Sequence, residues 1–86
     1  MKLLFFHSPT CRTCRNQAEE LGKEAAGYDI ERVDVTTADT APLMRRYRIT
    51  DVPTIIAVTS EGQCVKKWVD FTRFNEIRAF IGTSAG

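Results

Sequence analysis

The chain has 86 residues, of which 43% are hydrophobic and 27% are charged. This length suits one domain, residues 1–86, with a single core, and the composition excludes a disordered chain. A formal net charge of +1 argues against nucleic acid or an anionic membrane surface as a partner, and no apolar run reaches the roughly 18 residues of a membrane span. We expect a monomer.

The first half of the chain alternates between strand-like and helix-like patterns. The apolar run Lys2–Phe6 predicts a strand buried on both faces. From Cys11 the sequence becomes polar with apolar residues at helical spacing, which predicts a helix that Gly27 ends. Apolar and polar residues alternate over Ile30–Val35, which predicts a second strand.

A short helix and a hairpin follow. Asp39–Pro42 offers a capping side chain and a proline suited to a first helical turn, so we expect a short helix that reaches Tyr47. The β-branched run Val52–Val58 and the alternating run Cys64–Val69 flank the turn signal Ser60–Gln63. Together they predict an antiparallel hairpin.

The last segment predicts a helix that Thr72 caps and Gly82 ends, because its apolar residues fall at helical spacing: Phe74, Ile77, Phe80 and Ile81. Two strands joined by a helix should be parallel with a right-handed crossover. The hairpin adds two more strands to the same sheet. The expected fold is therefore α/β: a four-stranded mixed sheet flanked by three helices.

Two of the three cysteines form the motif Cys11-Arg12-Thr13-Cys14 at the start of the first predicted helix. Residues three apart on a helix lie on nearly one face, within disulfide reach. The positive end of the helix dipole favours an anion at Cys11, so we expect Cys11 to be the nucleophile. Cys14, one turn further in, would then resolve the mixed disulfide. Arg12 and Arg15 either add positive charge near the thiolate or are solvated.

The same cysteines have two other interpretations: they are structural, or they bind a metal. Zinc normally takes four ligands, and the available set would be His7, Cys11, Cys14 and Cys64. Cys64 follows the hairpin tip, which lies some 16 Å from the dithiol at ~3.3 Å per residue, so we expect no metal. An odd number of cysteines fits a reducing compartment, and we expect a cytoplasmic protein.

The Cys-x-x-Cys motif after a first strand, the segment Val52-Pro53-Thr54 at the third strand and the order of the elements resemble the thioredoxin and glutaredoxin superfamily. The resemblance runs from Leu3 to Ile81 and is to the small thioredoxin-like proteins. It implies a thioredoxin-like fold, a redox-active dithiol and no cofactor. It also implies that Pro53 is cis and lies against the dithiol, whereas proline at a strand start is common in any protein.

By the same resemblance, the backbone of Val52 pairs with an extended substrate, and Pro53, Arg12 and Thr13 complete the substrate-binding set. Thioredoxins have a buried acid six residues before the first cysteine, where this chain has Phe5. His7 is then either the proton shuttle, since histidine titrates near neutral pH, or a polar residue at the end of a strand.

We therefore expect an enzyme, a thiol–disulfide oxidoreductase that reduces disulfides of protein substrates through Cys11 and Cys14. Its electron donor would be a thioredoxin-reductase-type protein or glutathione. Two alternatives remain open: a glutaredoxin-like, glutathione-dependent reductase, and a redox-inactive module that binds peptides over Pro53. Asp51 would repel a glutathione carboxylate if its side chain faced the groove, which favours protein disulfides.

Overall fold

The computed structural model describes residues 1–85, with side chains up to residue 82. Four strands form one sheet in the order β2-β1-β3-β4: β1 (Lys2–His7), β2 (Ile30–Asp34), β3 (Thr54–Val58) and β4 (Cys64–Val69). β1 is parallel to β2 and antiparallel to β3, and β3 and β4 form the antiparallel hairpin. The mixed sheet predicted from the sequence is confirmed.

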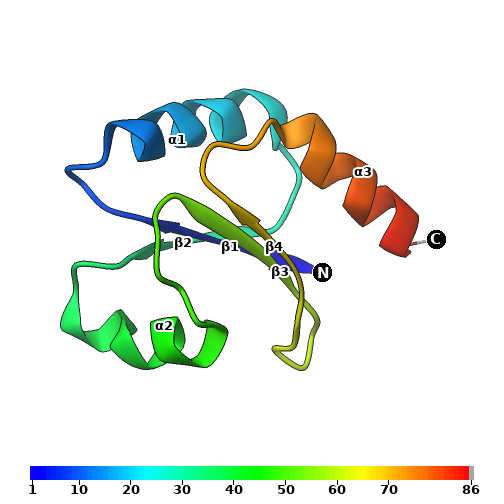
Figure 1. Ribbon diagram of the computed structural model, residues 1–86. Helices are drawn as coiled ribbons and strands as arrows, with labels where there is room; N and C mark the ends of the chain where they lie inside the picture. The colour runs from blue at the N-terminus through cyan, green and yellow to red at the C-terminus, as the bar shows by residue number, and fades with distance from the viewer. Residues whose placement is uncertain (86) are drawn as a thin grey trace.

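Helices cover both faces of this sheet. α1 (Arg12–Glu24) and α3 (Phe74–Ala85) lie on one face, and α2 (Ala41–Tyr47), preceded by a 3₁₀ turn over Ala38–Thr40, lies on the other (Figure 1). Among residues 1–85, none of these helices has the length and apolar character required to cross a bilayer. The layers are therefore helix, sheet, helix, as the predicted fold class requires.

Alternating side chains of the two central strands build a core on each face of the sheet. Leu3, Phe5 and Ile55 are buried together with residues of α1 and α3. Leu4, Phe6 and Ile56 are buried against Tyr47 of α2. β1 and β3 are paired on both edges and covered on both faces. They are therefore rigid supports for the loop that follows β1 and for the segment that precedes β3.

The strand register brings two distant segments to one edge of the sheet. His7 ends β1, and Phe6 pairs with Thr54, the first residue of β3. The loop into α1 therefore leaves the sheet where the chain enters β3, at Pro53. This edge is where the predicted dithiol and the predicted cis-proline can meet.

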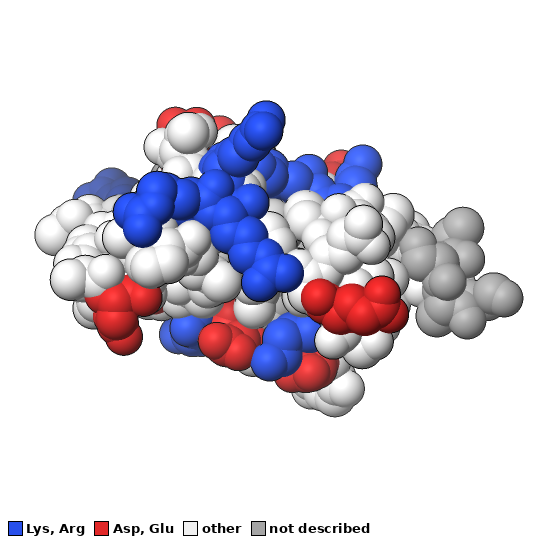
Figure 2. Space-filling model, turned by 90° about the horizontal axis from the view of Figure 1, so that it is seen from below, with Lys and Arg blue, Asp and Glu red and all other residues white. Residues whose placement is uncertain are grey.

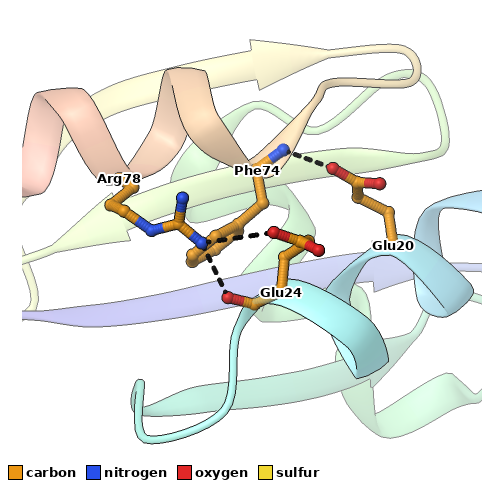
Figure 3. A network of polar contacts seen from close by, with 4 residues as sticks. All are labelled: Glu20, Glu24, Phe74 and Arg78. Carbon is orange, nitrogen blue, oxygen red and sulfur yellow. Dashed lines mark hydrogen bonds and ion pairs between the residues drawn. The ribbon is translucent and has the colours of Figure 1, made fainter.

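α1 and α3 are joined by polar contacts between their facing sides (Figure 3). The backbone N–H of Phe74 donates to Oε2 of Glu20 at 2.8 Å. Arg78 donates to the main-chain oxygen of Glu24 at 2.9 Å, lies 3.6 Å from its carboxylate and stacks over the Phe74 ring. The start of α3 is thus held by the end of α1.

These contacts correct the expected helix boundaries. Thr72 does not cap α3: its hydroxyl donates to the Asp70 carbonyl, and Glu20 accepts from the first turn instead. Gly82 does not end α3, which continues to Ala85. Thr40 gives α2 no side-chain cap, because its hydroxyl donates to the carbonyls that precede it.

The predicted end of α1 at Gly27 is also wrong. The helix stops at Glu24, three residues before Gly27, and the N–H of Ala25 closes its last turn on Leu21. Gly27 has φ +89° in the turn that follows, so it serves the connection to β2 rather than the helix end.

Gln17 is a fully buried polar side chain on the inner face of α1. Its Nε2 donates to the Thr72 carbonyl at 3.0 Å, and its Oε1 accepts from the Thr72 N–H at 2.8 Å. Both backbone groups are buried and have no other partner among the described residues. One side chain therefore fixes the loop between β4 and α3 against α1.

Gln17→Ala should destabilise the protein by about 2–4 kcal/mol, because it leaves a buried N–H and a buried carbonyl unpaired. Urea unfolding followed by circular dichroism measures the loss. Glu19→Ala on the exposed side of the same helix is the control and should change stability by less than about 0.5 kcal/mol. Equal effects of the two substitutions would contradict the clamping role of Gln17.

Candidate active site

The two motif cysteines lie at the N-terminal end of α1. Cys11 is the N-cap residue, with extended backbone dihedrals, and Cys14 is in the first turn. The backbone N–H of Cys14 donates to Sγ of Cys11 at 3.1 Å. Cys11 is partly exposed, whereas the Cys14 side chain is only 3% exposed. Both are free thiols, so the site is a reduced dithiol with one accessible sulfur.

The buried thiol of Cys14 is a weaker acid than a free cysteine. Burial is the main cause that raises the pKa of Cys14 to about 11, and the hydrogen bond between the two cysteine side chains raises it further. At neutral pH Cys14 is therefore a protonated thiol. The local fold thus makes the sulfur of Cys11 accessible to a partner molecule and keeps the sulfur of Cys14 buried and protonated.

The entry to β3 faces the outer sulfur. The peptide bond between Val52 and Pro53 is cis, and the carbonyl oxygen of Val52 lies 4.0 Å from Sγ of Cys11. Pro53 is buried, and its carbonyl accepts from the N–H of Asp70 at 2.9 Å. The dithiol, the cis-proline and the loop after β4 thus meet at one place.

A small cavity of about 260 Å³ adjoins this meeting point and is lined by Asp51, Val52, Val69 and Asp70. Within residues 1–85, no hydrogen bond uses the N–H of Val52. Val69 is 53% exposed, which is unusual for an apolar strand residue. The cavity is therefore lined by two aspartates, an exposed valine and Val52, whose N–H is unused and whose carbonyl lies next to Sγ of Cys11.

The other predicted substrate-binding residues lie around the dithiol. Arg12 is the first residue of α1 and is exposed, and Thr13 is partly buried. Neither Arg12 nor Arg15 forms an ion pair with a described residue. Their charges are thus available at the helix end that carries Cys11.

His7 lies at the end of β1, beside Asp34 in the register with β2. Its ring packs against Phe5 with the centroids 5.2 Å apart. No hydrogen bond among the described residues joins His7 to either cysteine. Thr36 donates two hydrogen bonds to Asp34, which lower the pKa of that carboxyl and keep it charged next to His7.

Cys64 is remote from the dithiol. It pairs with Val58 at one end of the hairpin, whereas Thr54, next to Pro53, pairs with Val69 at the other end. Four residues along a strand span roughly 13 Å. In the part of the chain that the structure describes, no three His, Cys, Asp or Glu side chains gather closely enough to hold a metal ion, so the four-ligand set is not assembled.

Two residues near the site had no role in the sequence interpretation. Gln17 lies one turn after Cys14 and clamps the loop that carries Asp70, and Val69 forms an apolar wall of the cavity. The signal for Gln17 was available, since it is the polar residue within the helical stripe that includes Cys14 and Leu21. The exposure of Val69 was not predictable, because strand alternation alone does not say which face stays uncovered.

This arrangement, a dithiol at a helix N-terminus that faces a cis-proline on a four-stranded mixed sheet, defines a protein of the thioredoxin-like fold, the fold of thiol redox proteins. Residues 2–81 match the family model described as Glutaredoxin-like domain (DUF836), and the chain belongs to this family. The superfamily expected from the two sequence motifs is thereby confirmed.

Solved thioredoxins share the fold. Thioredoxin-2 of a malaria parasite superposes with a TM-score of 0.79 at 24% identity, over 94% of this chain and 80% of that one. Thioredoxin 1 of Thermosipho africanus gives 0.75 at 21% identity over the whole of both chains. Fasciola hepatica thioredoxin gives 0.72 at 26% identity, over 94% and 77%. No curated protein matches the sequence.

Iodoacetamide at pH 8 should alkylate Cys11 and spare Cys14 in the native reduced protein, because Cys14 is buried and protonated. Labelling of Cys14 should increase only as the pH approaches 11, where its thiolate forms. Peptide mass spectrometry after timed quenching measures both rates, and labelling in denaturant is the control that equalises them. Faster labelling of Cys14 than of Cys11 would reverse the proposed order of the two sulfurs.

Proposed function

We propose that this protein is a thiol–disulfide oxidoreductase that reduces disulfides of protein substrates through Cys11 and Cys14. The fold and the family support a thiol redox role. The observation that carries the finer proposal is the pair of sulfurs at the start of α1, one reachable and one buried, in front of Val52 and Pro53. An odd number of cysteines fits a reducing compartment, so the proposed location is the cytoplasm.

The proposed reaction has two displacement steps. The Cys11 thiolate attacks one sulfur of the substrate disulfide, a mixed disulfide forms, and the other substrate sulfur leaves as a thiolate that takes a proton from water. Cys14 then loses its proton and attacks Sγ of Cys11, which releases the second substrate thiol. Two electrons pass to the substrate, and the enzyme is left with a disulfide between Cys11 and Cys14.

The second step needs a base, because burial keeps Cys14 protonated. His7 is the proposed shuttle: it lies at the end of β1, close to where the chain turns toward the dithiol, and an imidazole can accept and release a proton near neutral pH. Since no direct hydrogen bond joins His7 to a cysteine, the proton would move through water.

Substrate binding is assigned to the backbone at Val52 and the surface around it. The free N–H of Val52 and its carbonyl can pair with an extended peptide, as at a sheet edge. Pro53, Arg12 and Thr13 border the same place. An electron donor of the thioredoxin-reductase type, or glutathione, would return the disulfide to the dithiol.

A glutathione-dependent reaction is the second candidate, because the matching family model is described as glutaredoxin-like. The two carboxylates that line the cavity beside Val52, Asp51 and Asp70, argue against it. Glutathione carries two carboxylates of its own, and like charges at short range repel each other. We therefore favour protein disulfides.

Cys14→Ser should accumulate mixed disulfides on Cys11, since the second displacement is blocked. The immobilised variant is incubated with a cell extract, and the molecules that dithiothreitol releases from it are identified by mass spectrometry. Cys11→Ser is the matched control and should trap almost nothing, because the remaining thiol is buried and protonated. Both variants should carry Cys64→Ser, which removes the remote thiol and should leave insulin reduction by the otherwise intact protein unchanged.

The trapped species separate the candidates. Protein adducts support the proposed reductase, and an adduct of glutathione alone would favour the glutaredoxin-like reaction. A folded Cys14→Ser variant that traps neither, together with a wild-type protein that fails to accelerate insulin reduction, would exclude both and leave a peptide-binding module.

A further inference from the structure

A hollow on the α2 side of the molecule takes no part in the chemistry described so far. It has a volume of about 370 Å³ and runs along α2 and the residues that follow it. Its lining combines apolar and cationic side chains: Ala41, Met44, Arg45, Arg48, Ile49 and Thr50. We call this feature the α2 groove.

The α2 groove lies beside a cluster of basic side chains. In the view onto the α2 side, Lys and Arg side chains form a band across the middle of the surface (Figure 2). Arg45, Arg46, Arg48 and Lys67 all belong to α2 or contact its end. Four of the twelve Lys and Arg residues of the chain are thus gathered around α2.

Two of these four cations are already used within the fold. Lys67 donates to the carbonyls of Tyr47 and Arg48 at 2.8 and 3.1 Å and so satisfies the C-terminal end of α2. Arg46 donates to the Gly62 carbonyl at 3.2 Å in the hairpin turn and lies over the Tyr47 ring. These contacts give both side chains a structural role.

Arg45 and Arg48 have no such role. Both side chains are exposed, and neither hydrogen-bonds to, or forms an ion pair with, any residue that the structure describes. Arg48 also has φ +55°, a left-handed conformation that glycine or asparagine adopts more readily. A long cationic residue at this position is therefore not explained by the turn.

The α2 groove is connected to the dithiol edge by a short segment. Thr50 lines the groove, and Val52, two residues later, lines the cavity next to Cys11. From Arg48 to Val52 the chain can span at most roughly 14 Å. A protein interface of about 800 Å² per partner is about 30 Å across and would cover both features.

We propose that the α2 groove is the docking surface for an acidic segment of the protein that exchanges its disulfide with Cys11. This inference rests on the proposed function and adds the charge of the partner. Carboxylates of the segment pair with Arg45 and Arg48, and an apolar side chain enters the hollow beside Met44. Asp51 and Asp70 repel acidic residues close to the reacting sulfur, so the acidic segment must lie some four to five residues away from the partner's cysteine.

The test uses synthetic peptides that each contain one cysteine and are linked as disulfide dimers. One carries Glu-Leu-Glu beginning four residues from the cysteine, a second carries Lys-Leu-Lys there, and a third carries the Glu residues directly beside the cysteine. Reduced protein is mixed with each peptide, and the single-turnover oxidation of Cys11 and Cys14 is followed by acid quenching and mass spectrometry. No external electron donor is needed.

The distant Glu peptide should react roughly tenfold faster than either other peptide at 20 mM salt, because complementary charge accelerates association. At 500 mM salt the three rates should converge. Arg45→Glu with Arg48→Glu should abolish the preference, and Arg45→Lys with Arg48→Lys should keep most of it.

The matched control is Lys23→Glu with Arg32→Glu, which changes the net charge equally on the α1 side and should retain the preference. Uncharged hydroxyethyl disulfide should react equally with all variants. If hydroxyethyl disulfide and all three peptides fail to oxidise the wild-type protein, the proposed function is wrong. If the three peptides react at equal rates, the proposed function stands and the proposed docking surface is wrong. The proposed docking surface would also be wrong if a DNA oligonucleotide bound at Arg45 and Arg48 more tightly than the Glu peptide does. The same holds if the protein formed a dimer that Arg45→Glu dissociates.

Discussion

The pair of hydrogen bonds between Gln17 and the backbone of Thr72 is the contact on which the site depends. It joins α1 to a loop 55 residues later in the chain. That loop also holds Asp70, whose N–H binds the carbonyl of Pro53. The helix that carries the dithiol and the strand that carries the cis-proline are therefore fixed to each other through one buried amide. Burial makes this link strong, because none of its four polar groups can exchange its partner for water without cost.

Rigid placement matters because the two sulfurs of the dithiol are only one helical turn apart and must behave differently. The N-cap position leaves Cys11 open to solvent, while Cys14 lies under the packed layer of α1 and the sheet. The difference in burial is what keeps the proton on Cys14. A reaction that uses the two thiols in a fixed order can follow from this difference alone, without any further catalytic group to select between them.

The charge distribution divides the molecule into regions with different preferences. Asp51 and Asp70 line a small cavity that includes Val52, and Arg45 and Arg48 line a larger one on the α2 side. Arg48 is at most roughly 14 Å along the chain from Val52. A partner that covers both must carry charge of opposite sign at the two places. Selectivity in a small redox protein can thus arise from the spacing of surface charges, while the chemistry stays within two cysteines.

The strands, the helices and the dithiol could be predicted from the amino-acid sequence, because they depend on local periodicity and on residues three positions apart. The strand over Lys2–Phe6, which extends one residue further to His7, the strand Cys64–Val69 and the turn at Gly62 were predictable for this reason, and so was the motif from Cys11 to Cys14. The helix ends were less predictable. Thr72 has a suitable side chain for a helix cap. The N–H of Phe74 instead donates to Glu20, which is 54 residues earlier in the chain and lies nearby only because α1 packs beside α3.

The contacts between distant segments of the chain could not be predicted and are seen only in the folded structure. The burial of Cys14, the approach of Val52 to Cys11, the partner of Gln17 and the exposure of Arg45 and Arg48 all depend on how helices pack on the sheet. No local pattern encodes these contacts, because each arises between segments that are adjacent in space and distant in sequence.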